Sequence, residues 1–243
     1  MRLSRITFNL ASLLRAAMSE APKITYTRTR GLAELSRLIF AVKDVEIKED
    51  YLTTKAEFEN LKATGKLMFQ QIPLLEIDGL CLVETSAQAN YLGHKYDMLG
   101  GTDYERGRTQ MLFAGAQSLF IHGGYLWTLG EPEKKDEDLK AAIEKAKNRY
   151  LPAFEKALAD NGTGFLVGSS PTIADCSFFS IASHYEEMPE FGDLIEGSPH
   201  CKQAFLKKFA EIPGVKKYLN SPRRFPPLND ASIAEVKAAI LSK

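Results

Sequence analysis

The chain has 243 residues, of which 44% are hydrophobic, and its 31 basic residues equal its 31 acidic residues, so the formal net charge is zero. Balanced charge argues against a large nucleic-acid-binding surface, and no apolar run approaches the ~20 residues that a membrane-spanning helix needs. The three cysteines lie far apart and form no CxxC pair, which is typical of a reduced intracellular protein without disulfides.

Residues 1–22 differ from the rest of the chain. Their apolar side chains fall on one helical face, the arginines lie off that face, and no acidic residue precedes Glu20. This pattern is typical of a mitochondrial transit peptide. A disordered tail, or an upstream extension of a protein that starts at Met18, would show the same features, so all three interpretations stay open.

Strands and helices are expected to alternate from Lys23 to Gly100. The expected elements are strands at 24–26, 46–52, 73–77 and 80–83, and helices at 31–42, 56–63 and 85–96. Asp78-Gly79 between two apolar runs is a strong signal for a hairpin. The order predicts an α/β thioredoxin-like N-terminal domain, residues 23–100, with a mixed four-stranded sheet.

Beyond Gly100-Gly101 the patterns are helical. Helices are expected at 105–129, 137–159, 173–187, 202–209, 215–219 and 233–241. The change in composition and the Gly-Gly pair predict a domain boundary near residues 98–102. Residues 101–243 are therefore expected to form an all-α helical bundle.

Tyr26 is the first candidate for chemistry. A thioredoxin-like domain without a CxxC pair indicates sulfur chemistry on a bound thiol, whose pKa of ~8.5 leaves little reactive thiolate at neutral pH. Tyr26 ends the first strand, four residues before Arg30-Gly31 opens the first helix, so its hydroxyl can favour the anion near a helix dipole. From position alone, a packing role is the commoner one.

Two further segments have features of a peptide-binding site. Pro73 opens a strand after Ile72, so this bond can be cis and leave the backbone of Ile72 free to pair with an extended peptide. Glu84-Thr85 begins a helix, where a carboxylate can bind and Glu84 can hold an ammonium group. An ordinary strand-initiating proline and a plain helix N-cap are the competing interpretations.

The remaining candidate residues have a structural role or lack the spacing that a functional site needs. Thr172 and Asp175 have the spacing of a capping box. The four histidines have no metal-ligand spacing, so no metal site is expected. They are His94, His122, His184 and His200.

Together these residues resemble the glutathione transferase superfamily, and its cytosolic-type alpha class in particular, from Lys23 to the C-terminus. The stretches that carry the resemblance are residues 23–26 with Arg30-Gly31, 65–79, 148–156, 165–168 and 221–227. The resemblance implies a cytoplasmic homodimer without a cofactor, which conjugates the thiolate of glutathione, its co-substrate, to hydrophobic electrophiles for detoxification. Peroxidase or isomerase side activities are open.

The resemblance also implies a role for each site residue. Tyr26 would bind the sulfur and the backbone of Ile72, beside a cis Pro73, the cysteinyl part. Gln71, Glu84 and Thr85 would hold the γ-glutamyl end, and Lys62 would lie near the glycine carboxylate. The electrophile would contact Ile121, Gly124, Tyr125, Thr128 and Ile240. The first four share one helix face by spacing, as core residues also do, and Ile240 belongs to a lid-like last helix, 233–241.

Three positions depart from the alpha class. Leu32 stands where the class usually has arginine, and Ser118 where the partner subunit usually supplies an aspartate. Glu84 stands where glutamine is common, so Glu84 is expected to supply the missing negative charge for the γ-glutamyl ammonium. The departures keep a non-catalytic relative that binds glutathione or hydrophobic ligands as an alternative. A prostaglandin synthase of the sigma class is another.

Overall fold

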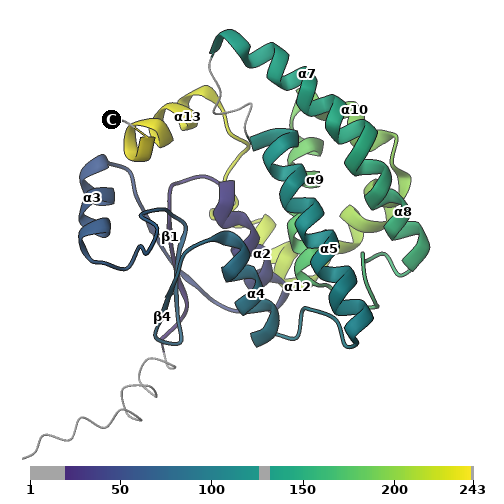
Figure 1. Ribbon diagram of the computed structural model, residues 1–243, viewed down its shortest axis with the longest axis horizontal. Helices are drawn as coiled ribbons and strands as arrows, with labels where there is room; N and C mark the ends of the chain where they lie inside the picture. Colours follow the sequence, from purple (N-terminus) through teal and green to yellow (C-terminus); the bar gives the residue numbers. More distant parts are fainter. Residues whose placement is uncertain (1–19, 126–131, 242–243) are drawn as a thin grey trace, which may run out of the picture.

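The computed structural model describes residues 20–125 and 132–241. Its sheet contains β1 (Lys23–Tyr26), β2 (Lys48–Tyr51), β3 (Leu74–Ile77) and β4 (Leu80–Leu82). The strand order is β2-β1-β3-β4, with β1 parallel to β2 and antiparallel to β3, and β3 antiparallel to β4. The predicted mixed four-stranded sheet is confirmed (Figure 1).

Strand register brings distant parts of the sequence to one end of the sheet. Thr25 of β1 pairs with Leu74 of β3, and Leu75 pairs with Leu82 of β4. Because these pairs are antiparallel, the end of β1, the start of β3 and the end of β4 meet at the same edge. The three segments that the sequence singled out follow or precede these strand ends.

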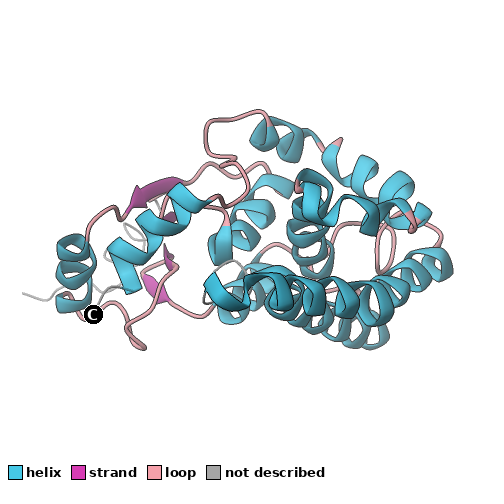
Figure 2. Cartoon of the chain, turned by 90° about the horizontal axis from the view of Figure 1, so that it is seen from above, coloured by secondary structure: helices cyan, strands magenta, loops and turns pink. Residues whose placement is uncertain are grey.

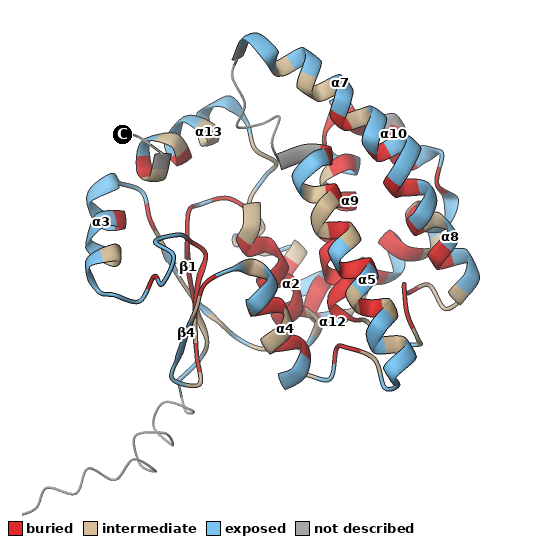
Figure 3. Ribbon diagram, in the orientation of Figure 1, coloured by how far each residue is buried: buried red, intermediate tan, exposed pale blue. Residues whose placement is uncertain are grey.

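Helices α2 (Glu34–Val42), α3 (Lys55–Ala63) and α4 (Thr85–Lys95) complete the sheet domain. The predicted first helix is present, but its opening turn, η1 (Gly31–Ala33), is a 3-10 turn. Helix α2 is buried almost all round, because it packs against α4 on one side and against α9 and α12 on the other (Figure 3). It is therefore the main contact between the sheet and the helices that follow.

The rest of the described chain is helical; Figure 2 shows most of its helices at the opposite end of the molecule from the strands, whereas the helix at the C-terminus lies beside the strands. The α-helices are α5 (Asp103–Phe120), α7 (Lys135–Lys145), α8 (Leu151–Asn161), α9 (Ile173–Glu187), α10 (Gly192–Glu196), α11 (Lys207–Ala210), α12 (Pro213–Leu219) and α13 (Asp230–Val236). The shorter turns are η2 (Ile121–Tyr125), η3 (Pro132–Lys134), η4 (Ala146–Tyr150), η5 (Pro189–Phe191), η6 (His200–Leu206) and η7 (Lys237–Leu241). The expected thioredoxin-like domain followed by a helical domain is confirmed.

The predicted helix over 105–129 differs from the structure in one respect. The α-helix ends at Phe120 and continues as a π-helical turn, η2, which has a different rotation per residue. The i, i+3, i+4, i+7 argument for a single face therefore does not extend past Phe120. Thr128 lies outside the described residues, as does almost all of the predicted segment 1–22.

The predicted capping box at the start of α9 is confirmed. The buried Asp175 carboxylate accepts hydrogen bonds from the Thr172 backbone N–H (2.8 Å), the Thr172 hydroxyl (2.7 Å) and the Leu166 N–H (2.7 Å). Burial raises the pKa of Asp175 to about 6, against the effect of these bonds. In the described part of the chain no helix is long and apolar enough to span a membrane.

Candidate functional site

The Tyr26 hydroxyl lies at the opening turn of the first helix. Tyr26 is 4% exposed, and its phenolic oxygen accepts a hydrogen bond of 3.2 Å from the Leu32 backbone N–H. That bond uses a lone pair of the oxygen and not its proton, because a phenol both accepts and donates. A phenol hydroxyl at this place is of the right chemistry to donate to an anion near the positive end of the helix dipole.

Gly31 allows this close approach. Its φ is +39°, and a Cβ at this position would lie 2.5 Å from the Tyr26 hydroxyl oxygen. A side chain would therefore displace the hydroxyl, in addition to the strain of a positive φ. The sequence placed Gly31 at a helix start but did not show that it touches Tyr26.

The segment before β3 lies beside the end of β1. The Ile72–Pro73 peptide bond is cis, and both residues precede the first paired position of β3. Ile72 is buried, whereas Gln71 is exposed and follows Gln70, which has a φ of 56°. The backbone of Ile72 thus lies beyond the end of the strand ladder, where an extended peptide can pair with it.

Gln88 of α4 is a residue that the sequence did not single out. Its side-chain amide donates to the carbonyl of Pro73 (2.9 Å) and to that of Leu82 (2.8 Å), and it accepts from the Ser36 hydroxyl (3.0 Å). Gln88 is fully buried. It joins the start of β3, the end of β4 and α2. A glutamine on the apolar face of the predicted helix was the available signal.

Glu84 and Thr85 mark the start of α4 at the same edge. Glu84 holds the N-cap position with a φ of 66°, is exposed, and makes no side-chain capping bond. The plain N-cap interpretation therefore does not describe Glu84, because its carboxylate satisfies no N–H of the first turn. A non-glycine residue with a positive φ is uncommon and is concentrated at ligand sites.

Lys62 lies on α3, between β2 and β3 in the chain. Its ammonium pairs with Glu59 at 2.5 Å on the same helix and lies 4.8 Å from the centroid of the Phe58 ring. The structure thus brings Tyr26 and the segments 71–73 and 84–85 to one edge, which we call the substrate edge. Lys62 is not part of this edge in the structure, because its ammonium pairs with Glu59 on its own helix.

The predicted electrophile residues come from two places. Ile121 is 40% exposed at the end of α5, and the Gly123 carbonyl in the same turn accepts a 2.7 Å bond from the Tyr185 hydroxyl. Ile240 packs against the core in η7, which contacts α3 (Figure 1). Gly124 and Tyr125 belong to η2, but their side-chain positions lie outside the described part.

Three ion pairs, joined into a ring by one backbone hydrogen bond, lie beside the Tyr26 turn. Glu187 of α9 accepts from both Arg30 and Arg224, the Arg224–Glu187 bond being 2.8 Å. Arg224 also donates to Glu34, whose backbone N–H donates to the Arg30 carbonyl at 3.0 Å. We call Arg30, Glu187, Arg224 and Glu34 the arginine–glutamate ring. The sequence analysis missed it because its members are up to 194 residues apart.

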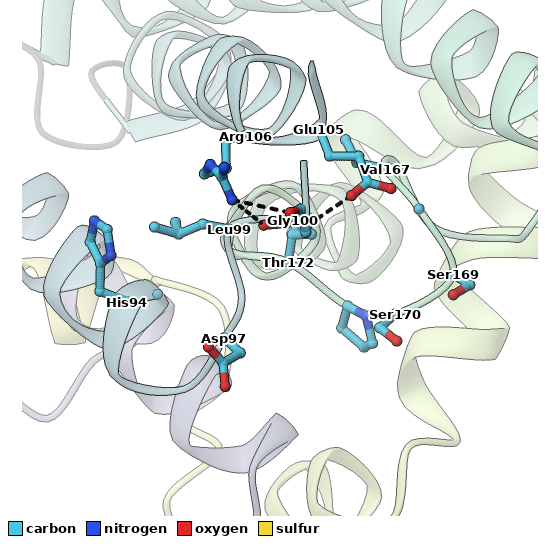
Figure 4. A pocket seen from close by; sticks show the side chains of 14 residues that line it. His94, Asp97, Leu99, Gly100, Glu105, Arg106, Val167, Ser169, Ser170 and Thr172 are labelled. Atoms are coloured by element: carbon cyan, nitrogen blue, oxygen red, sulfur yellow. Dashed lines mark hydrogen bonds between the residues drawn. The ribbon is translucent and has the colours of Figure 1, made fainter. Parts of the chain in front are cut away.

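A hollow of about 660 Å³ lies where the two domains join (Figure 4). Two of its charged groups bind the Gly100-Gly101 segment between the domains: Glu105 accepts from the Gly101 N–H (2.8 Å), and Arg106 donates to the Gly101 carbonyl (3.2 Å). Because the Glu105 and Arg106 side chains already bind backbone groups of Gly101, we assign the hollow no substrate. Within residues 20–125 and 132–241, no three His, Cys, Asp or Glu side chains are placed to hold a metal ion.

Comparison with known proteins gives consistent matches. Family models described as the glutathione S-transferase N-terminal domain and C-terminal domain match residues 22–94 and 121–222. Human glutathione S-transferase A1 is 37% identical over 90% of this chain and 98% of its own length. Rat glutathione S-transferase alpha-4 is 36% identical over 92% of this chain and 99% of its own.

Solved structures agree with these sequence matches. The structure titled NaGST-2 has a TM-score of 0.69 and 30% identity, and covers 83% of this chain and 97% of its own. The glutathione S-transferase from Ascaris lumbricoides has a TM-score of 0.69 and 29% identity, and covers 82% of this chain and 96% of its own.

Proposed function

The chain belongs to the glutathione S-transferase family, and from this premise we propose that Tyr26 activates the glutathione thiol for attack on hydrophobic electrophiles. The protein is an alpha-class glutathione transferase. The single observation that carries the assignment of Tyr26 is its buried hydroxyl, 3.2 Å from the Leu32 N–H, at the sheet end where three candidate segments meet. A phenol that donates to sulfur favours the thiolate and lowers the pKa of the thiol.

The substrate edge supplies groups for the rest of the tripeptide. The backbone of Ile72, beside Pro73, pairs with the cysteinyl part. The uncapped N-terminus of α4 at Thr85 attracts the γ-glutamyl carboxylate, since its first N–H groups lack a side-chain cap. Glu84 holds the γ-glutamyl ammonium, with Gln71 beside it. We assign the glycine carboxylate to Lys62, which must leave Glu59 to reach it.

We propose that the electrophile binds between the end of α5 and the C-terminal helix. The residues concerned are Ile121, Gly124, Tyr125, Thr128 and Ile240. Support comes from the exposed Ile121 and from η7, which contacts α3 of the glutathione-binding domain. The same site would serve peroxidase or isomerase side activities.

We also propose a homodimer. Met68 is 78% exposed and Phe69 is 59% exposed, next to the substrate edge, and Tyr104 and Met111 of α5 are exposed as well. Large apolar side chains in water are typical of interaction surfaces. Light scattering should give twice the chain mass, and Phe69→Ser should shift the protein toward monomer. A wild-type monomer would contradict the proposal.

The domain limits and the location are further proposals. We place the domains at 23–100 and 101–243, since the strands lie between Lys23 and Leu82 and the family models match 22–94 and 121–222. We place the protein in the cytoplasm, consistent with its free cysteines. The N-terminal family model begins at residue 22, and the mitochondrial alternative gains no support from the comparisons.

The test is conjugation of glutathione to a generic aryl halide. Tyr26→Phe removes the hydroxyl and keeps the ring, and we expect kcat/KM to fall by about 10²-fold, as when one donor to a reacting anion is deleted. Tyr91→Phe is the matched control, because it also removes a tyrosine hydroxyl, one that donates to Asp78 at 2.5 Å. Equal activity of Tyr26→Phe and the wild type would overturn the assignment.

A further inference from the structure

We propose that Glu187, a residue of the helical domain, is a positioning residue for thiol activation, because it fixes Arg30 and through Arg30 the turn that holds the Tyr26 hydroxyl. The inference rests on the proposed role of Tyr26. It assigns Glu187 no contact with glutathione.

The first step is the link from Arg30 to Tyr26. Arg30 is the N-cap of the turn Gly31–Ala33, and Leu32 in this turn donates to the Tyr26 hydroxyl. Gly31 packs so closely on that hydroxyl that a Cβ would meet it at 2.5 Å. Any shift of the Arg30 backbone therefore moves Leu32, which donates to the Tyr26 hydroxyl, and Gly31, which packs on it.

The second step is what holds Arg30. Its guanidinium donates through Nη2 to the Glu187 carboxylate and through Nε to the Phe225 carbonyl. Its Nη1 is buried and has no hydrogen-bond partner within the described residues. Glu187 is thus the one side chain, among those described, that fixes the Arg30 guanidinium by an ion pair.

The third step is the origin of Glu187. It is the last residue of α9, in the helical domain, and is 36% exposed. Its other oxygen binds Arg224 at 2.8 Å, and Arg224 binds Glu34 at the start of α2. The ring closes on itself, so Glu187 locks the Tyr26 turn to the helical domain rather than to the sheet alone.

A positioning role for Glu187 and a purely electrostatic role predict opposite changes in the pKa of the bound thiol. Glu187→Ala removes the anchor and should raise the pKa of the bound glutathione thiol by at least half a unit, which lowers the ratio of thiolate to thiol about threefold at any given pH. Loss of a negative charge acting only through space would lower that pKa. Glu187→Gln keeps an oxygen that accepts from Arg30, and we expect it to restore most of the wild-type value.

The experiment is an ultraviolet titration of the thiolate in the complex of each variant with glutathione, together with kcat/KM and the KM for a generic aryl halide. For Glu187→Ala we expect kcat/KM to fall several-fold while the KM for the halide changes less than twofold. Glu186→Ala, the exposed neighbour on α9, is the matched control and should behave as wild type. Thermal melting verifies that each variant is folded.

Two outcomes overturn the inference. One is an unchanged or lowered thiol pKa in Glu187→Ala, and the other is equal behaviour of the Ala and Gln variants. If Glu187→Ala does not fold, Gln and Asp form the decisive pair, because Asp keeps the charge but is one methylene too short. Positioning predicts that Gln is normal and Asp impaired. An unchanged pKa in Tyr26→Phe would instead refute the proposed function, so the two failures are distinguishable.

Discussion

The substrate edge and the arginine–glutamate ring differ in whether their polar groups are paired within the protein. At the edge, Glu84 is exposed at a positive φ without a capping bond, and Ile72 lies beyond the strand ladder. In the ring, Glu34 is buried and accepts from Tyr218 at 2.7 Å and from Arg224. Groups paired within the protein hold it together, whereas groups left without such partners are available to a ligand.

The ring should dominate stability. Glu34→Ala leaves Arg224 without one of its two carboxylates in a buried site, and we expect a loss of about 3–5 kcal/mol in the free energy of unfolding. Urea denaturation measures it. The exposed Glu46→Ala should stay within about 0.5 kcal/mol of wild type. A loss below about 1 kcal/mol in Glu34→Ala would remove the distinction between ring and edge.

The pH dependence of stability gives a second test of the ring, because the charge of its Arg30 acts on His184. Burial, and next the charge of Arg30, lower the pKa of His184 to about 4. The folded state thus favours neutral histidine, so this stabilisation is complete above the unfolded pKa of ~6.5 and is lost as the pH falls toward 4.

The expected loss from His184 is up to about 3 kcal/mol between pH 6.5 and 4. His184→Gln should flatten this part of the stability curve, measured by urea denaturation at each pH. His94→Gln, an exposed position on α4, should leave the curve unchanged. Parallel curves for wild type and His184→Gln would contradict the account.

Gln88 joins the two regions, because it ties the edge to α2. Gln88→Leu deprives the Pro73 and Leu82 carbonyls and the Ser36 hydroxyl of a partner, and we expect about 1–3 kcal/mol of destabilisation with weaker glutathione binding. Ser86→Ala, exposed on the same helix, is the control. Urea denaturation measures the stability, and calorimetry measures the affinity for glutathione. A change in only one of these two quantities in Gln88→Leu would refute the proposal that Gln88 joins the two regions.

Glu84 should show the smallest effect, and only on binding. Glu84→Gln removes the charge that holds the γ-glutamyl ammonium, so the Kd for glutathione should rise several-fold, about 1 kcal/mol or less, with an unchanged melting temperature. Asp97→Asn is a matched control, because Asp97 is also exposed, with a φ of 53°, just beyond the other end of α4. An unchanged Kd would refute the role of Glu84.

The sheet was predictable because its signals are local. Asp78-Gly79 lies between β3 and β4, and the Thr172–Asp175 box opens α9 as the spacing predicted. The convergence of Tyr26 with Ile72-Pro73 and Glu84-Thr85 follows from the spatial order of the strands in the mixed sheet, of which the sequence predicted the thioredoxin-like type. Their roles toward glutathione stay predictions.

What the sequence could not show depends on distant contacts. Arg30 and Glu187 are 157 residues apart, and neither position has a pattern of its own. The change from α-helix to π turn after Phe120 also has no periodic signal, because the spacing of apolar residues looks continuous there. Gln88 was visible only as a polar residue on an apolar face.

The central claim is that Tyr26 stabilises the glutathione thiolate. Ultraviolet titration of the thiolate in the binary complex tests it without an electrophile. We expect the bound thiol to have a pKa below the ~8.5 of a free thiol, and Tyr26→Phe to raise it by about one unit or more, a tenfold fall in the ratio of thiolate to thiol. The same bound pKa in wild type and Tyr26→Phe, both saturated with glutathione, would contradict the account.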